Sequence, residues 1–174
     1  MAASKIYLAP GASGGIERLH RHRDGLTQRG LEVELVPLPR GTAERAMPAY
    51  RDAVPESGRA AVAIGGQSFG GRVASLIAAE AAPAALILIS YPLHAPGRHE
   101  AWRDRTSHWP EIACPVLLLS GESDPFARID LLRRAIEQLP DATLRTWPDA
   151  GHGFRGPVLD EALDAIVAFL EERT

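Results

Sequence analysis

The chain has 174 residues, of which 45% are hydrophobic and 24% charged, and its formal net charge at pH 7 is -3. These values are ordinary for a globular protein with one core, so we expect a single domain over residues 1–174. The negative net charge argues against nucleic acid as the main partner, because phosphate binding needs a concentrated basic face. The single cysteine, Cys114, excludes an intrachain disulfide and a cysteine-based metal site.

Short apolar runs alternate with helical patterns along the chain. Strands are expected at 5–9, 31–38, 61–65, 84–90, 115–120 and 143–147, and helices at 16–29, 44–54, 73–79, 129–138 and 159–172. Only residues 31–38 alternate apolar with acidic side chains, which favours a strand at a sheet edge. Pro48 is expected to interrupt the helix at 44–54. The basic cluster at 18–23 (RLHRHR) is expected to be a solvated helix face.

The inner strands are apolar throughout, as strands covered by helices on both faces must be. The sequence therefore predicts an α/β fold: a three-layer α/β/α sandwich with a mostly parallel, six-stranded, doubly wound sheet. Residues 91–111 form a long connection with little periodicity, and connections of this length are often functional. No apolar run approaches the length of a membrane span, and no signal peptide is recognised, so we expect a cytoplasmic protein without a membrane partner.

Gly66-Gln67-Ser68-Phe69-Gly70 has the G-x-S-x-G pattern of a nucleophile elbow, between a predicted strand and a predicted helix. A strand that enters a helix within two residues forces the serine into a strained backbone conformation with positive φ. Side chains at Gly66 and Gly70 would collide in such a turn. The pattern therefore predicts that the Ser68 hydroxyl stands clear of the sheet, at the N-terminus of a helix that favours developing negative charge.

Ligands of open α/β sheets bind beyond the carboxyl ends of the strands, so the residues that follow each strand are the candidates for the site. Asp124 follows the strand at 115–120 and His152 follows the strand at 143–147. With Ser68 they give the chain order Ser, Asp, His of the nucleophile-elbow hydrolases. We expect Ser68 to be the nucleophile, His152 its base and Asp124 the carboxylate that orients the base. Glu122 is the alternative acid, whereas Asp149 is expected to shape the turn before His152.

The oxyanion hole is expected to use the backbone N–H groups of Phe69 and of Ala12, the latter in the loop after the first strand. Tyr91, His94 and Trp102 are expected to be walls of a shallow, open substrate site. The histidines outside the triad lack metal-ligand spacing, and the loop at 11–15 fits no phosphate-loop pattern, so no metal or cofactor is expected.

Four motifs together resemble the α/β-hydrolase family, and more narrowly its small, capless, dienelactone-hydrolase-like members: 65–75, 91–97 (YPLHAPG), 121–126 (GESDPF) and 151–154 (GHGF). That group includes proteins related to a subunit of the nonspecific-lethal histone acetyltransferase complex. The resemblance implies strand order 2-1-3-4-5-6 in this chain's own count, and the connection at 91–111 is too short for a cap domain. The chain departs from the family at Pro10-Gly11, where His-Gly is common.

The expected function is a serine hydrolase that cleaves a small-molecule ester or thioester through an acyl-enzyme. Two alternatives stay open at this point. One is a binding or scaffold protein that keeps the fold without the activity, and the other is a hydrolase of a different bond, since fold and triad do not fix the substrate. The assembly is open between a monomer and a homodimer.

Overall fold

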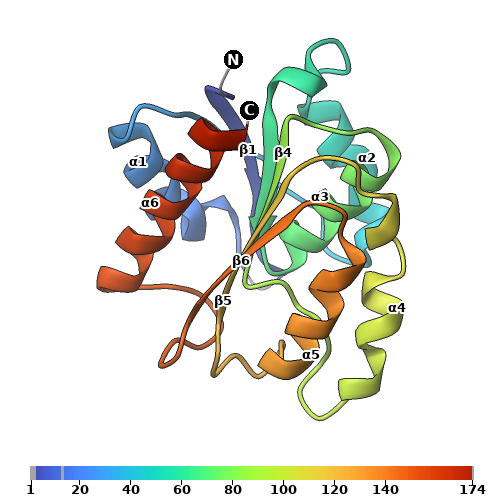
Figure 1. Ribbon diagram of the computed structural model, residues 1–174. Coiled ribbons are helices and arrows are strands. Elements are labelled where there is room, and N and C mark those ends of the chain that lie inside the picture. Colours follow the sequence, from blue (N-terminus) through green and yellow to red (C-terminus); the bar gives the residue numbers. More distant parts are fainter. Residues whose placement is uncertain (1–2, 13, 174) are drawn as a thin grey trace.

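Six strands form one sheet in residues 3–12 and 14–173, the part of the chain that the computed structural model describes (Figure 1). The sheet has the order β2-β1-β3-β4-β5-β6, and every neighbouring pair is parallel. This confirms the predicted strand order and the edge position of the acidic strand, and the sheet is fully parallel. The strands are β1 (Lys5–Ala9), β2 (Glu32–Leu35), β3 (Ala63–Gln67), β4 (Ala85–Ile89), β5 (Val116–Gly121) and β6 (Ala142–Trp147).

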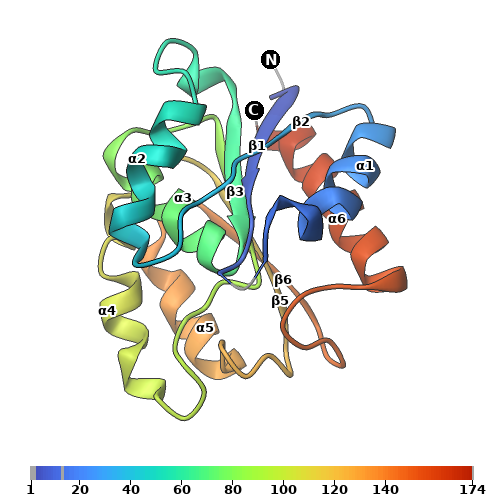
Figure 2. The same cartoon turned by 180° about the vertical axis from the view of Figure 1, so that it is seen from behind.

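Helices cover both faces of this sheet, as the apolar inner strands predicted (Figures 1 and 2). Along β4, Leu86 and Leu88 point into one apolar core and Ile87 points into the other, because successive strand residues face opposite sides. One face carries α1 (His20–Gln28) and α6 (Gly156–Arg173), and the other carries α2 (Ala43–Ala53), α3 (Phe69–Glu80) and α5 (Ile129–Ala135), with α4 (Trp102–Thr106) against α5.

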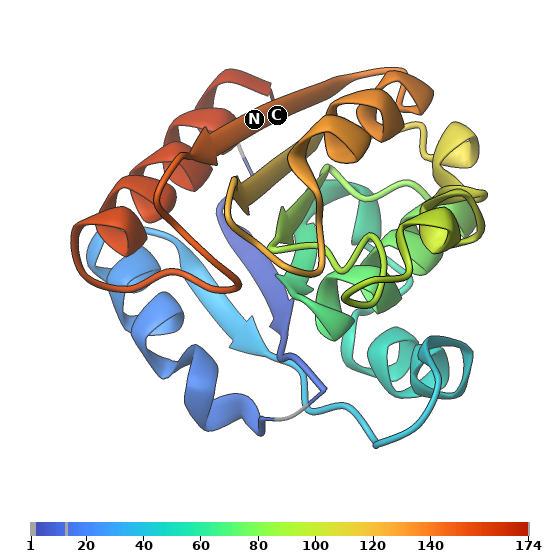
Figure 3. The ribbon, with the colours of Figure 1, turned by 90° about the horizontal axis from the view of Figure 1, so that it is seen from below.

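The strand register places the loops after β1 and β4 on either side of the end of β3. Ala9 at the end of β1 pairs with Gly66 of β3, and Gln67 of β3 pairs with Ile89 of β4. The loops that follow β1 and β4 therefore flank the residue that follows β3. Figure 3 looks onto the edge at which the strands end, where these loops meet the loops after β5 and β6. The order of strands also reverses between β1 and β3, which is where ligands bind in sheets of this kind.

Two helix predictions need correction. α2 runs from Ala43 to Ala53 without a break at Pro48. Pro48 is on the exposed side of the helix, so the carbonyl that its missing N–H leaves unpaired can face water. The aperiodic connection after β4 contains short helical segments, at His99–Ala101, in α4 and at Trp109–Glu111. Each is too short for hydrophobic periodicity to reveal it.

The basic cluster at 18–23 is exposed at Arg18 and Arg21, as predicted, but not at His22. His22 is buried against the core shared with α6, and neither of its ring nitrogens has a hydrogen-bond partner among the residues that the structure describes. Burial lowers the pKa of His22 to about 4, so the ring is neutral at pH 7. The neighbouring Leu19 and Leu26 are buried as well. This helix face therefore belongs to the core rather than to the solvated surface.

Tyr50 links α2 to the middle of the sheet. Its buried hydroxyl accepts a hydrogen bond from the N–H of Gly65 in β3 and lies 2.9 Å from the carbonyl oxygen of Tyr7 in β1. These bonds satisfy backbone groups where β3 approaches its end. Hydrogen bonds from α2 thus hold β3, the strand that precedes the elbow, in place.

Candidate active site

Ser68 stands alone between β3 and α3, with φ of 50° and ψ of -116°. Such a conformation is rare for a residue with a side chain and persists only where its surroundings impose it. A Cβ atom on Gly66 would lie 2.6 Å from the carbonyl oxygen of Ala9, and one on Gly70 would lie closer still to the same atom. The two glycines are required because the end of β1 presses against the elbow.

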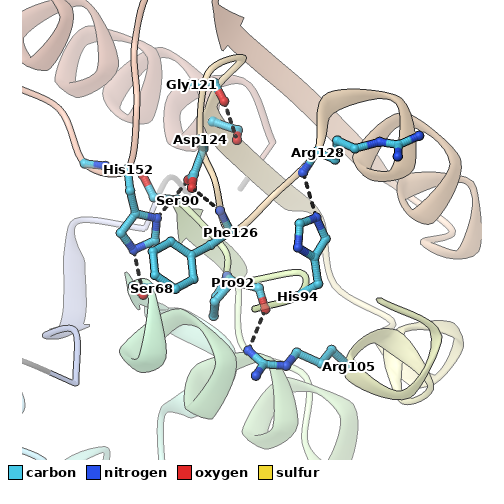
Figure 4. Close-up of polar contacts among 12 residues, drawn as sticks. Ser68, Ser90, Pro92, His94, Arg105, Gly121, Asp124, Phe126, Arg128 and His152 are labelled. Atoms are coloured by element: carbon cyan, nitrogen blue, oxygen red, sulfur yellow. Dashed lines mark hydrogen bonds and ion pairs between the residues drawn. The ribbon is translucent and has the colours of Figure 1, made fainter. Parts of the chain in front are cut away.

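His152 joins Ser68 to Asp124 (Figure 4). Its Nε2 atom lies 2.9 Å from Ser68 Oγ, and its Nδ1 atom lies 2.8 Å from Asp124 Oδ2. The Asp124 side chain is fully buried, and its other oxygen accepts a hydrogen bond of 2.8 Å from the N–H of Phe126. With the carboxylate on Nδ1–H, the unprotonated Nε2 faces the hydroxyl. The structure therefore brings the three predicted residues into one hydrogen-bonded chain.

The other two acids near the end of β5 and β6 lie elsewhere. Glu122 accepts a hydrogen bond of 2.6 Å from the Thr146 hydroxyl and faces the exposed Arg133. Asp149 is exposed in the turn that precedes the histidine. Of the three acids, only Asp124 contacts the His152 ring.

A cavity of about 430 Å³ opens beside the Ser68 hydroxyl. Ala12 and Phe69, the two residues expected to supply oxyanion donors, both line it. The loop after β1 approaches the nucleophile closely, since a Cβ atom on Gly11 would lie 3.6 Å from Ser68 Cβ. The neighbouring Ser13 lies outside the described residues. The remaining lining comes from Gly41, Thr42, Ala43, Glu44, Arg72, Pro92, Ala95, Arg105 and Phe126.

The chain matches a family model described as "Alpha/beta hydrolase domain" over residues 39–165, which is more than half of its length. The chain belongs to the alpha/beta hydrolase family. The matched span contains Ser68, His152 and Asp124. It leaves out the first strand and its loop, for which the structural likeness below supplies the comparison.

Three crystal structures illustrate the fold that this alpha/beta hydrolase shares. A monoacylglycerol lipase from Paleococcus ferrophilus has a TM-score of 0.84 at 18% identity, over 98% of this chain and 95% of that one. A dienelactone hydrolase from Anabaena variabilis has a TM-score of 0.74 at 23% identity, over 99% and 85%. Est1E from Butyrivibrio proteoclasticus, with ferulic acid bound, has a TM-score of 0.76 at 17% identity, over 99% and 90%. The resemblance to the acetyltransferase-complex subunit stays a prediction.

The three residues expected as substrate walls do not line the cavity of this hydrolase. Tyr91 is buried in the core, and its hydroxyl donates a hydrogen bond of 2.7 Å to the backbone carbonyl of Arg105. The ring of the buried Trp102 contacts the guanidinium groups of Arg103 and Arg134, whose carbons lie 4.9 and 5.8 Å from its centroid. His94 is buried with an exposed fraction of 1%. The prediction was wrong because the connection after β4 turns these large side chains inward, and Pro92 and Ala95 face the cavity instead.

His94 has a different place in the hydrolase: it holds the loop that carries Asp124 (Figure 4). Its ring Nε2 atom accepts a hydrogen bond of 3.0 Å from the backbone N–H of Arg128. Its backbone N–H donates one of 3.0 Å to the carbonyl oxygen of Phe126. Nδ1 lies 2.9 Å from the Ala95 carbonyl, which fixes the proton on that nitrogen. His94 thus ties the connection after β4 to the acid loop.

Ser90 holds the histidine loop in the same manner, and sequence reasoning missed it. It follows β4, has φ of 51°, and is fully buried. Its hydroxyl accepts a hydrogen bond of 3.1 Å from the N–H of Gly153, next to His152. The sequence signal for Ser90 was its position directly after an apolar strand, at the sheet edge that also carries Ser68.

Within the same described residues, no cluster of three or more His, Cys, Asp or Glu side chains could hold a metal ion. None of the helices there combines the length and apolarity needed to cross a bilayer. Cys114 is buried, and burial raises the pKa of its thiol to about 12. A thiol in that state is packed rather than reactive.

Proposed function

We propose that this alpha/beta hydrolase is a serine hydrolase that cleaves a small ester or thioester through an acyl-enzyme. The observation that carries the proposal is the chain of contacts from Ser68 Oγ to His152 Nε2 and from His152 Nδ1 to the buried Asp124. A nucleophile, a base within hydrogen-bond reach, and a third group that orients the base are the parts that acyl transfer by serine requires.

The three side chains have different roles in the reaction. Ser68 Oγ attacks the carbonyl carbon while His152 Nε2 takes the hydroxyl proton, and the same nitrogen then gives that proton to the departing oxygen or sulfur. Asp124 keeps the imidazole in the required tautomer and stabilises the imidazolium. Water, activated by His152, then cleaves the acyl-enzyme. The backbone N–H groups of Phe69 and Ala12 are the donors we assign to the oxyanion.

The size of the cavity supports a small substrate. Its volume of about 430 Å³ is at the lower end of ordinary small-molecule sites. The segment between β4 and β5 borders the cavity with Pro92 and Ala95 and forms short helices instead of a separate lid. We therefore expect substrates with short acyl groups rather than with long lipid chains.

The test is hydrolysis of p-nitrophenyl acetate by wild type, Ser68→Ala and Ser75→Ala. Ser75 offers a matched control because its hydroxyl lies 2.8 Å from His108 Nε2, yet it is fully buried in α3, where no substrate reaches it. We expect Ser68→Ala to lose at least about a thousandfold in kcat and Ser75→Ala to stay within severalfold of wild type. Wild-type protein that turns over no short ester or thioester would contradict the proposal and favour a scaffold role for the fold.

A further inference from the structure

We propose that the cavity beside Ser68 selects esters whose acyl part ends in a second, free carboxylate, which Arg72 and Arg105 bind. The substrate class is thus the half-ester of a dicarboxylic acid. The inference deepens the proposed function and rests on it for the hydrolytic step, but the carboxylate site itself can be tested by binding alone.

Arg72 is positioned by the same helix that presents the nucleophile. It lies four residues after Ser68, and its N–H donates to the Ser68 carbonyl oxygen at 3.1 Å, so both residues share one helix face. Long side chains on a helix lean toward its N-terminus, which here is the nucleophile end. Arg72 lines the cavity together with Ser68. A ligand held on Ser68 therefore passes within reach of this guanidinium.

Within the part of the chain that the structure describes, the Arg72 guanidinium has one carboxylate partner, Glu44, and one nitrogen without any partner. Its side chain is 22% exposed, and its Nη1 atom is buried without a hydrogen-bond partner. The nearest carboxylate oxygen belongs to Glu44, which is 3.7 Å from Nη2 and mostly exposed to solvent. An exposed pair at that distance contributes little. The Nη1 donors of this largely buried guanidinium are thus left for an acceptor that the described residues do not supply.

Arg105 reaches the same cavity from α4 and is held in place (Figure 4). Its Nη1 atom donates 2.9 Å to the carbonyl oxygen of Pro92, and its own carbonyl accepts the Tyr91 hydroxyl. Burial, and next the positive charge of Arg72, lower the pKa of Arg105. Two guanidinium groups that repel each other beside a nucleophile are stabilised when an anion lies between them.

The charge of the lining fits one carboxylate. Arg72 and Arg105 carry two positive charges against the single negative charge of Glu44. His108 lies close enough to sense Arg72, but burial lowers its pKa to about 4, so it adds no charge at pH 7. A monoanion leaves this lining neutral, whereas a phosphate dianion leaves it negative. A free carboxylate on the substrate is the matching group.

The carboxylate belongs on the acyl side because of where the proton goes. His152 protonates the departing alcohol, so the leaving group lies on the His152 side of Ser68. The Arg105 guanidinium lies beside Pro92, away from the His152 ring (Figure 4). The bond between the carbonyl carbon and the alcohol oxygen breaks, and the bond to Ser68 Oγ forms. Water then replaces Ser68 on the acyl group, and the products are a dicarboxylate and an alcohol.

The test compares monomethyl glutarate with dimethyl glutarate, which differ only by the methyl group on the second carboxylate, with methanol release followed by NMR. We expect wild type to prefer the monoanion by about tenfold or more in kcat/KM, and Arg72→Gln to bring that ratio to about one. Arg103→Gln is the matched control, since Arg103 is exposed on the same short helix as Arg105 and does not line the cavity. An equal or reversed preference in wild type, or a preference that survives Arg72→Gln, overturns the carboxylate site.

A binding measurement separates this inference from the hydrolase itself. Isothermal titration calorimetry of Ser68→Ala with monomethyl glutarate should show binding that the further change Arg72→Gln removes and dimethyl glutarate does not reproduce. Hydrolysis of the neutral diester without this binding rejects the carboxylate site and leaves the hydrolase in place. Binding without hydrolysis of either ester keeps the site and rejects the proposed function.

Discussion

His152 Nε2 lies 2.9 Å from Ser68 Oγ although 84 residues separate the two in the chain. The serine is fixed by the elbow after β3, and the histidine is fixed by a loop that Ser90 holds through Gly153. Their contact therefore depends on two neighbouring parallel strands, β3 and β4, ending at the same edge of the sheet. The predictions below test the groups that maintain this contact.

The first prediction distinguishes the two acids that follow β5. Asp124→Asn should reduce kcat toward p-nitrophenyl acetate by about a thousandfold to ten-thousandfold, because an amide at this site no longer favours the tautomer with an unprotonated Nε2. Glu122→Gln should remain within severalfold of wild type, since Glu122 contacts Thr146 and Arg133 instead. Steady-state kinetics of the two variants checks this. A larger loss in Glu122→Gln than in Asp124→Asn would contradict the assignment.

The second prediction concerns the crowding of the elbow by β1. Gly70→Ala should lower the free energy of unfolding by about 3 kcal/mol or more, because the new methyl group overlaps the Ala9 carbonyl and backbone cannot move aside cheaply. Gly151→Ala is the matched control: among the described residues, apart from its chain neighbours, no atom lies within 4 Å of a Cβ atom there, so we expect a change within about 0.5 kcal/mol. Urea unfolding of both variants measures the difference. Similar stability of the two would show that the elbow tolerates a side chain.

The third prediction is a loss of stability in mild acid that traces to His22. Its pKa is about 4 in the folded protein, below the ordinary value of 6.5, so between these values the unfolded chain binds a proton that the folded chain does not. Stability therefore falls as the pH drops from 6.5 toward 4, and this residue contributes about 2 kcal/mol of that loss between pH 7.5 and pH 5.

Urea unfolding at those two pH values, in wild type and His22→Leu, tests the assignment. His108, whose pKa is also lowered to about 4, adds a loss of the same sign, so the variant should keep part of the pH dependence. An undiminished pH dependence in His22→Leu would show that the buried ring of α1 is not its source.

Sequence reasoning predicted the three residues that the structure joins by hydrogen bonds, because local rules apply to them. The elbow pattern fixed Ser68, and the rule that sites lie after strands led to Asp124 and His152. It failed for Tyr91, His94 and Trp102, because an aperiodic connection does not reveal which of its side chains turn toward the core. Tyr50 and Ser90 were out of reach for a related reason. Their hydrogen bonds join elements far apart in the chain, so a local pattern, such as the end of the apolar strand at Ser90, does not reveal the partner.

Arg72 is an intermediate case. Its place four residues after the nucleophile was visible in the sequence, and helical spacing alone puts it on the face of Ser68. The sequence did not indicate that Arg105 lines the same cavity, because this residue lies in α4, within an irregular connection. The cationic lining of the cavity combines the two, so the proposed substrate preference depends on tertiary structure.

The most direct measurement of the central claim is labelling of the protein with a fluorophosphonate probe, followed by peptide mapping of the adduct. The Ser68–His152 contact predicts a single phosphonylated residue, Ser68, and a loss of labelling in both Ser68→Ala and His152→Ala while Ser75→Ala labels as wild type does. Absence of labelling in folded wild-type protein, or an adduct on a residue other than Ser68, would contradict the account.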